Sequence, residues 1–231
     1  MDRTSYVLAA WIAAAAMVGF SVPALFVGVL RLRRSAYLVP YIISTSLFLI
    51  VFVRWNRLEP RELLAHNWMW GVGVGVLLAG FTVGNVLSQP VSPRRRGVPL
   101  ALDVFWSGVV YGTVDALLLS VLPVLATWQA VGTAGWTTSW IGKGAVAVLA
   151  LCASLVVTVA YHLGYPEYRH GGLLGPVVGN TAMTLGFVIS GNPLAAVISH
   201  VAMHVAAVLR GPARVAQLPP HYPDAHRGRS C

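Results

Sequence analysis

The chain has 231 residues, of which 57% are hydrophobic and only 10% are charged, and its formal net charge is +9 at pH 7. A soluble domain carries roughly a quarter charged residues, so this composition excludes an ordinary water-soluble protein and indicates a membrane protein. The arginines cluster between apolar runs, which membrane topology explains better than a nucleic-acid surface does, and no nucleic-acid partner is predicted.

Apolar runs of about the length needed to cross a bilayer recur along the whole chain. In chain order they cover 5–30, 36–53, 64–88, 101–126, 141–163, 173–190 and 193–209. We therefore predict an all-α fold, a polytopic membrane helical bundle of about seven transmembrane helices. The first run is longer than a signal-peptide core and is expected to be retained as a span.

The last two runs are joined by Ser190-Gly191-Asn192. Asn192 is a favourable N-cap residue and Pro193 suits the first helical position, so a tight helical hairpin is predicted here. The glycines Gly71 and Gly75 have the small-x-x-x-small spacing that favours close helix packing, and no strand and loop surround them as a nucleotide site would need.

The arginine distribution predicts an integral protein of the cell (plasma) membrane, with the N-terminus outside and the C-terminus in the cytoplasm. The predicted cytoplasmic side holds Arg31, Arg33, Arg34, Arg94, Arg95, Arg96, Arg169, Arg210 and Arg214, whereas the outer side holds Arg3, Arg54, Arg57, Arg61 and Lys143. The lipid bilayer is the partner that this topology implies.

The pattern predicts three parts. Residues 1–100 form three N-terminal transmembrane helices, residues 101–210 form a core of four spans, and residues 211–231 form a Pro-rich polar tail that is expected to be disordered. Cys152 lies within an apolar run and Cys231 is the last residue, so no disulfide framework is predicted.

Several ionisable residues lie within the predicted spans, where a charged group costs at least ~2.5 kcal/mol. Asp103 and Asp115 fall in the fourth run, His162 ends the fifth, and His200 and His204 lie in the seventh. Each therefore needs a partner, which can be another side chain, water or a metal. Asp103 is close to Arg94–Arg96, so an interfacial ion pair is predicted there.

His200 and His204 are one helical turn apart, so both imidazoles point to the same side. This spacing allows two nitrogens to reach one cation, and it equally allows each histidine to hydrogen-bond a neighbouring helix. Asp115 is either paired, protonated or a base. The helical rise of about 1.5 Å per residue gives the depth of each side chain in the membrane and predicts that Asp115 and His200 can meet. The same estimate places His162 nearer the inner face, closer to Asp103 and His204.

Three segments resemble motifs of the CPBP (CAAX prenyl protease and bacteriocin-processing, or Abi) family of intramembrane metalloproteases. SLVVTVAYHLGY, 154–165, resembles the F-x-x-x-H motif with Thr158 in place of Phe; GFVISGNPLAAVISHVAMH, 186–204, resembles the H-x-x-x-N motif with His204 in place of Asn. YGTVDALLLSVLP, 111–123, is similar in placement to the E-E-x-x-x-R motif, but Asp115 replaces a glutamate and no Arg follows.

The resemblance covers roughly residues 100–210, and it implies hydrolysis of a peptide bond near the bilayer surface. Carried over by position, Asp115 is the general base, His162 and His200 hold an oxyanion or a metal, and His204 replaces the amide of the oxyanion hole. A divalent metal such as zinc would then be held by His162, His200 and His204, and the substrate would be a peptide or a membrane protein.

Two other hypotheses stay open. In the first, the chain is a non-catalytic membrane protein of the same fold, a structural or partner-binding bundle in which the polar residues hold helices together. In the second it is a transporter or a proton relay, because ionisable residues are spread over several helices. A Glu167–Arg169 pair is expected in the loop that follows His162.

Overall fold

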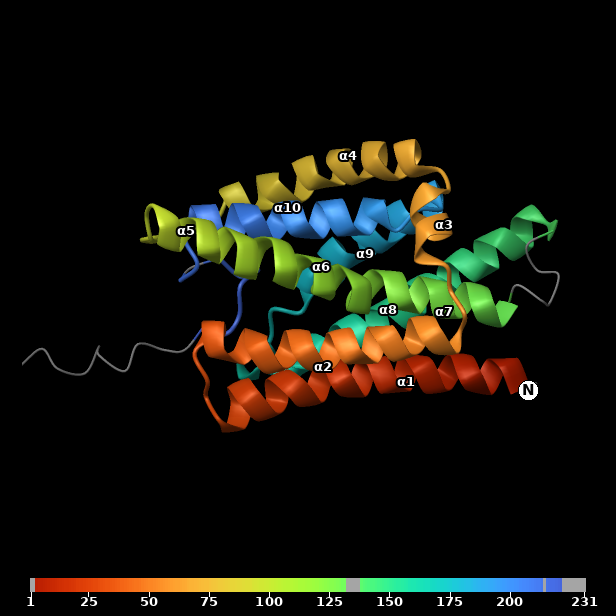
Figure 1. Cartoon of the computed structure of the whole chain (residues 1–231), viewed down its shortest axis with the longest axis horizontal. Coiled ribbons are helices and arrows are strands. Elements are labelled where there is room, and N and C mark those ends of the chain that lie inside the picture. Colours follow the sequence, from red (N-terminus) through yellow and green to blue (C-terminus); the bar gives the residue numbers. More distant parts are fainter. Residues whose placement is uncertain (1–2, 132–137, 214, 222–231) are drawn as a thin grey trace, which may run out of the picture.

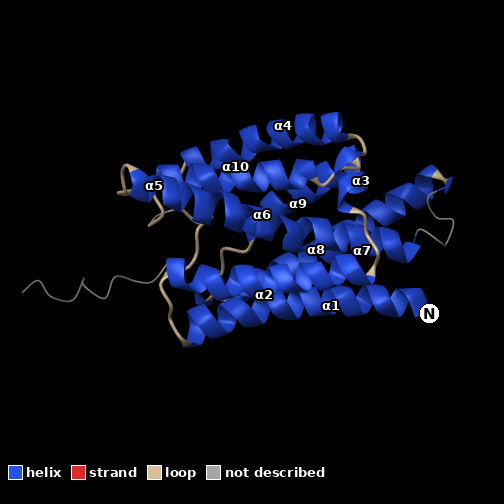
Figure 2. Ribbon diagram, in the orientation of Figure 1, coloured by secondary structure: helices blue, strands red, loops and turns tan. Residues whose placement is uncertain are grey.

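A computed structural model describes residues 3–131, 138–213 and 215–221, and throughout this part of the chain the regular structure is helical (Figures 1 and 2). The helices are α1 (Arg3–Pro23), η1 (Ala24–Val29), α2 (Arg34–Trp55), α3 (Pro60–Ala65), α4 (Trp68–Leu87), α5 (Val98–Asp103), η2 (Val104–Val110), α6 (Tyr111–Ala116), η3 (Leu117–Val121), α7 (Leu122–Val131), α8 (Trp140–Gly164), η5 (Pro166–Tyr168), α9 (Leu174–Ser190) and α10 (Leu194–Arg210).

The helices run back and forth between the two ends of an elongated bundle (Figure 1). Segments α5, η2, α6, η3 and α7 form one continuous helix, Val98–Val131, which lies between the α1–α2 pair and the α4–α10 pair. Within its most apolar window 78% of this helix is buried, against 22–39% for the other long helices, so it is the central element of the bundle.

Five helical segments are long and apolar enough to cross a membrane: Ala9–Val29, Arg34–Trp55, Trp68–Leu87, Val98–Val131 and Trp140–Gly164. The helical membrane architecture agrees with the prediction, and the predicted boundaries fall within a few residues of the observed helices. Helices α9 and α10 have 17 residues each and are shorter than these five, so the count of seven spans is not confirmed. The third predicted run is divided at Asn67, whose φ of 50° separates α3 from α4.

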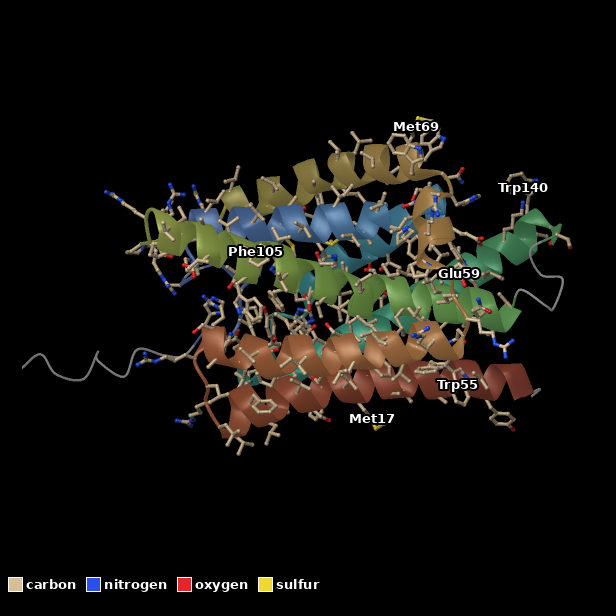
Figure 3. All side chains as sticks on the ribbon, in the orientation of Figure 1. Met17, Trp55, Glu59, Met69, Phe105 and Trp140 are labelled. Atoms are coloured by element: carbon tan, nitrogen blue, oxygen red, sulfur yellow. The ribbon has the colours of Figure 1, made fainter. Side chains whose placement is uncertain are left out.

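Lipid-facing character is visible on the outside of the bundle (Figure 3). Met17 and Phe105 are 64% and 59% exposed on different helices, and the rings of Trp55 and Trp140 lie near helix ends. Tryptophan is enriched at membrane interfaces and apolar side chains face the hydrocarbon, so this surface suits a bilayer better than water.

Glycines determine how closely α10 approaches its neighbours. A Cβ at Gly112 would lie 3.1 Å from His204 Cδ2, and one at Gly108 would lie 2.8 Å from Val205 Cγ2. On the opposite side, Gly71 contacts Asn192 and Gly75 contacts the backbone of α10 at Ala195, as predicted from their spacing. Helix α10 is therefore held between two glycine-lined faces, one of which belongs to the central helix.

The α9–α10 hairpin forms as predicted, with a boundary one residue later. The backbone N–H of Leu194 donates to Asn192 Oδ1 at 2.8 Å, and α10 begins at Leu194. The Asn192 amide also donates to the carbonyls of Leu63 and Leu64, at 3.2 and 3.0 Å, which ties α3 to this end of α10. One asparagine therefore caps α10 and satisfies carbonyls at the end of a second helix.

The C-terminal tail differs from the expectation of disorder over residues 211–213 and 215–221. Val215 and Leu218 are fully buried, and Arg34 donates from Nη2 to the carbonyl of Pro212 at 2.8 Å. The Pro-rich composition predicted disorder because the tail has few apolar residues. Two well-spaced apolar side chains are enough to hold the tail in place when the bundle provides a groove. The rest of the predicted disordered tail, residues 222–231, lies outside the described residues.

The two predicted loop ion pairs have different outcomes. Asp103 lies 3.1 Å from Arg95, which confirms an ion pair at the end of the bundle. The Glu167–Arg169 pair is wrong: Glu167 instead pairs with His221 at 3.1 Å, while Arg169 donates to the carbonyls of Leu163 and Gly164. The folded tail brings His221 to Glu167, and sequence distance alone did not reveal that contact.

Candidate functional site

The buried acid of the central helix has a defined pair of partners. Tyr41 donates its hydroxyl proton to Asp115 Oδ1 at 2.7 Å, and Asp115 Oδ2 lies 3.5 Å from His204 Nε2. All three side chains are buried, Tyr41 entirely so. The π-helical segments η2 and η3 flank α6, which carries Asp115, and such irregular turns within a helix are frequent at functional sites.

The histidine pair on α10 extends this arrangement. The rings of His200 and His204 are stacked with centroids 6.2 Å apart, and the His204 ring lies against that of Tyr111 at 4.7 Å. At 3.5 Å the contact with Asp115 is too long for a well-formed hydrogen bond. Among the described residues, both ring nitrogens of His204 and the Nδ1 nitrogen of His200 lack a hydrogen-bond partner. We call Tyr41, Asp115, His200 and His204 the acid–imidazole site.

His162 occupies a separate position. Its Nδ1 lies 2.8 Å from the carbonyl oxygen of Thr158, and its ring packs edge-on against those of Tyr161 and Tyr168, both at 5.0 Å. The depth estimate paired Asp115 with His200, whereas the structure brings His204 into direct contact with the acid. That difference arises because Gly112 allows α10 to approach the central helix at the level of His204.

A cavity of about 410 Å³ joins all four predicted site residues, Asp115, His162, His200 and His204. Its wall also contains Phe81 of α4 and Leu174 and Val178 of α9, which are 56%, 76% and 51% exposed. The cavity therefore runs from the buried acid to the outer surface between α4 and α9. A ligand with an apolar part could enter there from the lipid.

Tyrosines form the part of the site that the sequence analysis missed. The hydroxyls of Tyr111 and Tyr161 are 2.5 Å apart, those of Tyr161 and Tyr165 are 2.7 Å apart, and those of Tyr165 and Tyr37 are 2.5 Å apart. Burial raises the pKa of Tyr165, which lies beyond the end of α8, so its hydroxyl stays neutral. We call these four residues the tyrosine chain.

A regular spacing in the sequence could have revealed these tyrosines. Tyr37 and Tyr41 are four residues apart on α2, Tyr161 and Tyr165 have the same spacing around the end of α8, and Tyr111 precedes Asp115 by one turn. Residues at this spacing share one helix face, so each pair faces the bundle interior together. A search for repeated polar pairs, rather than for ionisable residues alone, would have included them.

A second buried polar group lies beside the acid–imidazole site. Asn180 of α9 accepts from Ser120 at 2.9 Å and donates to Ser154 and Thr158 at 2.8 and 2.7 Å. Thr184 completes the group by donating to Ser120 at 3.0 Å. We call these five residues, from the central helix, α8 and α9, the hydroxyl–amide cluster. Every side-chain polar atom in it has a partner.

The predicted metal ligands His162, His200 and His204 are not found as one cluster in the described part of the chain. Over the described ranges, no three His, Cys, Asp or Glu side chains gather closely enough to hold an ion. His162 Nδ1 faces the carbonyl of Thr158 at 2.8 Å, so this nitrogen is already engaged. We therefore assign no step of the chemistry to zinc.

No family model, no curated protein and no solved structure matches this chain. The CPBP-like assignment thus depends on the residues quoted above and stays a prediction.

Proposed function

We propose that the chain is an intramembrane hydrolase that cleaves a peptide bond near the bilayer surface, as its resemblance to the CPBP family implies. The observation that carries the proposal is the buried contact between Asp115 and His204 on the wall of a cavity that reaches the lipid-facing surface. A buried carboxylate beside an imidazole is the arrangement that general acid–base catalysis uses.

The partners of Asp115 favour a revised division of roles. One carboxylate oxygen accepts from Tyr41 and the other faces His204 Nε2 at 3.5 Å, so the acid is held against the imidazole. His204 is better placed, because Nε2 faces the acid while Nδ1 has no partner within the described chain. We assign His204 as the general base and Asp115 as the group that orients it and stabilises its charged form.

The reaction then follows in two proton transfers. His204 Nδ1 is buried, so the proposal requires that substrate binding admit a water to it. Nδ1 then takes a proton from that water as the water oxygen attacks the carbonyl carbon of the substrate. His200, on the same cavity wall, is assigned to donate to the resulting oxyanion. The C–N bond breaks as His204 returns its proton to the leaving nitrogen, so water is divided between the two products and the imidazole is restored.

Hydrolysis by the purified chain in lipid nanodiscs tests this proposal. Quenched-fluorescent peptides carrying an apolar segment are the substrates, and new amino termini are identified by mass spectrometry. We expect cleavage by the wild type, loss of cleavage in Asp115→Asn and His204→Gln, and retention in Asp103→Asn. Asp103 is a matched acid on the same helix whose partner is Arg95 at the bundle end. Equal rates in all four proteins would contradict the proposal.

The tyrosine chain favours a second candidate function, proton transfer through the bundle. Each hydroxyl can donate and accept, and four of them in series provide neighbouring sites between which protons can hop. Proteoliposomes loaded with a pH-sensitive dye test it. Under this candidate an imposed potential moves protons, and Tyr161→Phe, which interrupts the chain at its middle, abolishes the flux.

A further inference from the structure

The folded part of the C-terminal tail lies in a groove that borders the catalytic cavity. Ala216, Gln217 and Pro219 all line the cavity that contains Asp115 and His204. Residues 215–221 lie at the bundle end where α10 ends and α5 begins (left in Figure 1). A segment of the chain itself therefore closes one end of the proposed active site.

Most polar contacts in this groove are made to the backbone of the tail. The Ala216 N–H donates to Gln89 Oε1 at 2.9 Å, and the Ala216 carbonyl accepts from the Tyr168 hydroxyl at 2.8 Å. Arg34 donates to the carbonyl of Pro212 at 2.8 Å and to those of Pro219 and Pro220 at 3.3 Å each. Recognition of this kind does not depend on the side chains of the bound segment.

Only a few tail side chains are recognised. Val215 and Leu218 are fully buried, three residues apart, and serve as apolar anchors. The Gln217 side chain accepts a hydrogen bond from Gln89 at 3.0 Å and donates one to Asn85 at 3.2 Å. His221 contacts the Glu167 carboxylate through its backbone N–H and its ring. The groove thus combines backbone hydrogen bonds with two apolar anchor sites, which lie at the two ends of a turn between Val215 and Leu218.

We propose that this groove is a binding site for a peptide that forms a turn between two apolar anchors, and that the tail occupies it in competition with such a peptide. This inference rests on the proposed function, because the groove would deliver a peptide substrate to the Asp115–His204 pair. The tail then holds the enzyme closed at this end, and a substrate must displace it.

A chain with a specific protease site inserted between Gly211 and Pro212 tests the proposal. The chain folds with its tail and is then cut in nanodiscs and washed, so folding does not depend on truncation. The probe is a fluorescein-labelled peptide with the sequence of residues 212–221, PARVAQLPPH. A tethered segment competes at an effective concentration in the millimolar range, so we expect the cut chain to bind the probe at least about tenfold more tightly than the uncut chain.

Point variants locate the binding in the groove. In the cut chain, Tyr168→Phe and Gln89→Ala should each weaken probe binding about threefold to tenfold. Tyr168→Phe removes one hydrogen bond to the peptide backbone, and Gln89→Ala removes one to the backbone and one to the Gln217 side chain. Ser88→Ala is the matched control, since the Ser88 hydroxyl donates to the carbonyl of Asn85 on its own helix, and no contact of this hydroxyl with the tail is found among the described residues. Replacing Val215 and Leu218 of the probe by serine should abolish binding, whereas replacing Gln217 by alanine should not.

The outcomes separate this inference from the proposed function. If the cut chain binds the probe but hydrolyses no peptide, the groove stands and the hydrolase does not. If hydrolysis occurs at the same rate before and after cutting, and the probe binds both forms equally, the competing tail is refuted while the hydrolase stands. Probe binding that is equally tight in the wild type, Tyr168→Phe and Gln89→Ala would also overturn the proposal.

Discussion

The two buried polar groups of the bundle, the acid–imidazole site and the hydroxyl–amide cluster, differ in how completely they are satisfied. In the cluster, Asn180 and its four hydroxyl partners bond one another or nearby carbonyls. In the site, buried nitrogens of His200 and His204 have no partner among the described residues. A satisfied network stabilises helix packing, whereas unpaired buried imidazole nitrogens are costly and indicate a site arranged for a ligand or a reaction.

This comparison predicts that the two groups respond differently to mutation. Substitutions in the acid–imidazole site should remove activity with little change in stability. Substitutions in the hydroxyl–amide cluster should lower stability with little change in activity.

The largest expected effect is the loss of the acid–base pair. His204→Gln should lower the hydrolysis rate about 10²–10⁴-fold, because a general base contributes that much to a proton-transfer step. Initial rates on a quenched-fluorescent peptide in nanodiscs measure it. Thermal stability should stay within a few degrees of the wild type, and a large fall in stability with proportionate loss of activity would place His204 among the structural residues.

Asn180→Ala should give the opposite result. Removing the amide breaks bonds to Ser120, Ser154 and Thr158 in a buried setting and should lower the free energy of unfolding by about 1–3 kcal/mol. Unfolding in detergent, followed by tryptophan fluorescence, measures it. Thr113→Val is the control, since the Thr113 hydroxyl donates to the carbonyl of Val109 in its own helix. An unchanged unfolding free energy, accompanied by lost activity, would reverse the assignment of the two groups.

Gly112→Ala tests whether close helix approach creates the site. The added Cβ would lie 3.1 Å from both His204 Cδ2 and Val201 Cα, so α10 must move away from the central helix. We expect about a tenfold loss of hydrolysis, because small displacements of catalytic groups are costly. Gly80→Ala is the matched control, as a Cβ there meets nothing within 4 Å. Equal activity in the two variants would show that the helices adjust freely.

A smaller effect is expected for Tyr41→Phe. The Tyr41 hydroxyl fixes one oxygen of Asp115 at 2.7 Å without facing the substrate, so its removal should cost about threefold to tenfold in rate. The pH–rate profile should shift as well, which a purely structural role would not produce. Ser44→Ala is the control and should leave that profile in place, because the Ser44 hydroxyl, on the same helix, bonds to the carbonyls of Pro40 and Tyr41.

The smallest expected effect is that of metal removal. Because no group of three metal-binding side chains gathers within the described ranges, prolonged treatment with 1,10-phenanthroline should leave the hydrolysis rate unchanged. Loss of activity that returns with added zinc would restore the metal prediction for His162, His200 and His204.

The sequence was sufficient for the helices because span length and apolar composition are local properties. It also singled out Asp115 and His204 as candidates, since an ionisable residue within an apolar run is conspicuous, and their role stays a prediction. The pairing between them depended on Gly108 and Gly112, whose small size brings α10 close to the central helix. The four-residue spacing of Gly108 and Gly112 can be read from the sequence. The helix that packs against these two glycines is set by the tertiary structure.

Two features were not predicted, for different reasons. Tyr37 and Tyr41 lie in the part of the chain that offered no motif, and tyrosine is common in apolar segments without any special role. The folded tail depends on a groove built from Arg34, Gln89 and Tyr168, which are distant in sequence. The composition of the tail indicates disorder because composition contains no information about the groove.

The most direct test of the account is a double-mutant cycle on the rate of peptide hydrolysis, using Asp115→Asn, His204→Gln and the double variant. If the two residues act as one catalytic unit, the double variant is no slower than the slower single variant. If the two losses multiply, Asp115 and His204 act independently, and the account of a coupled acid–imidazole site is wrong.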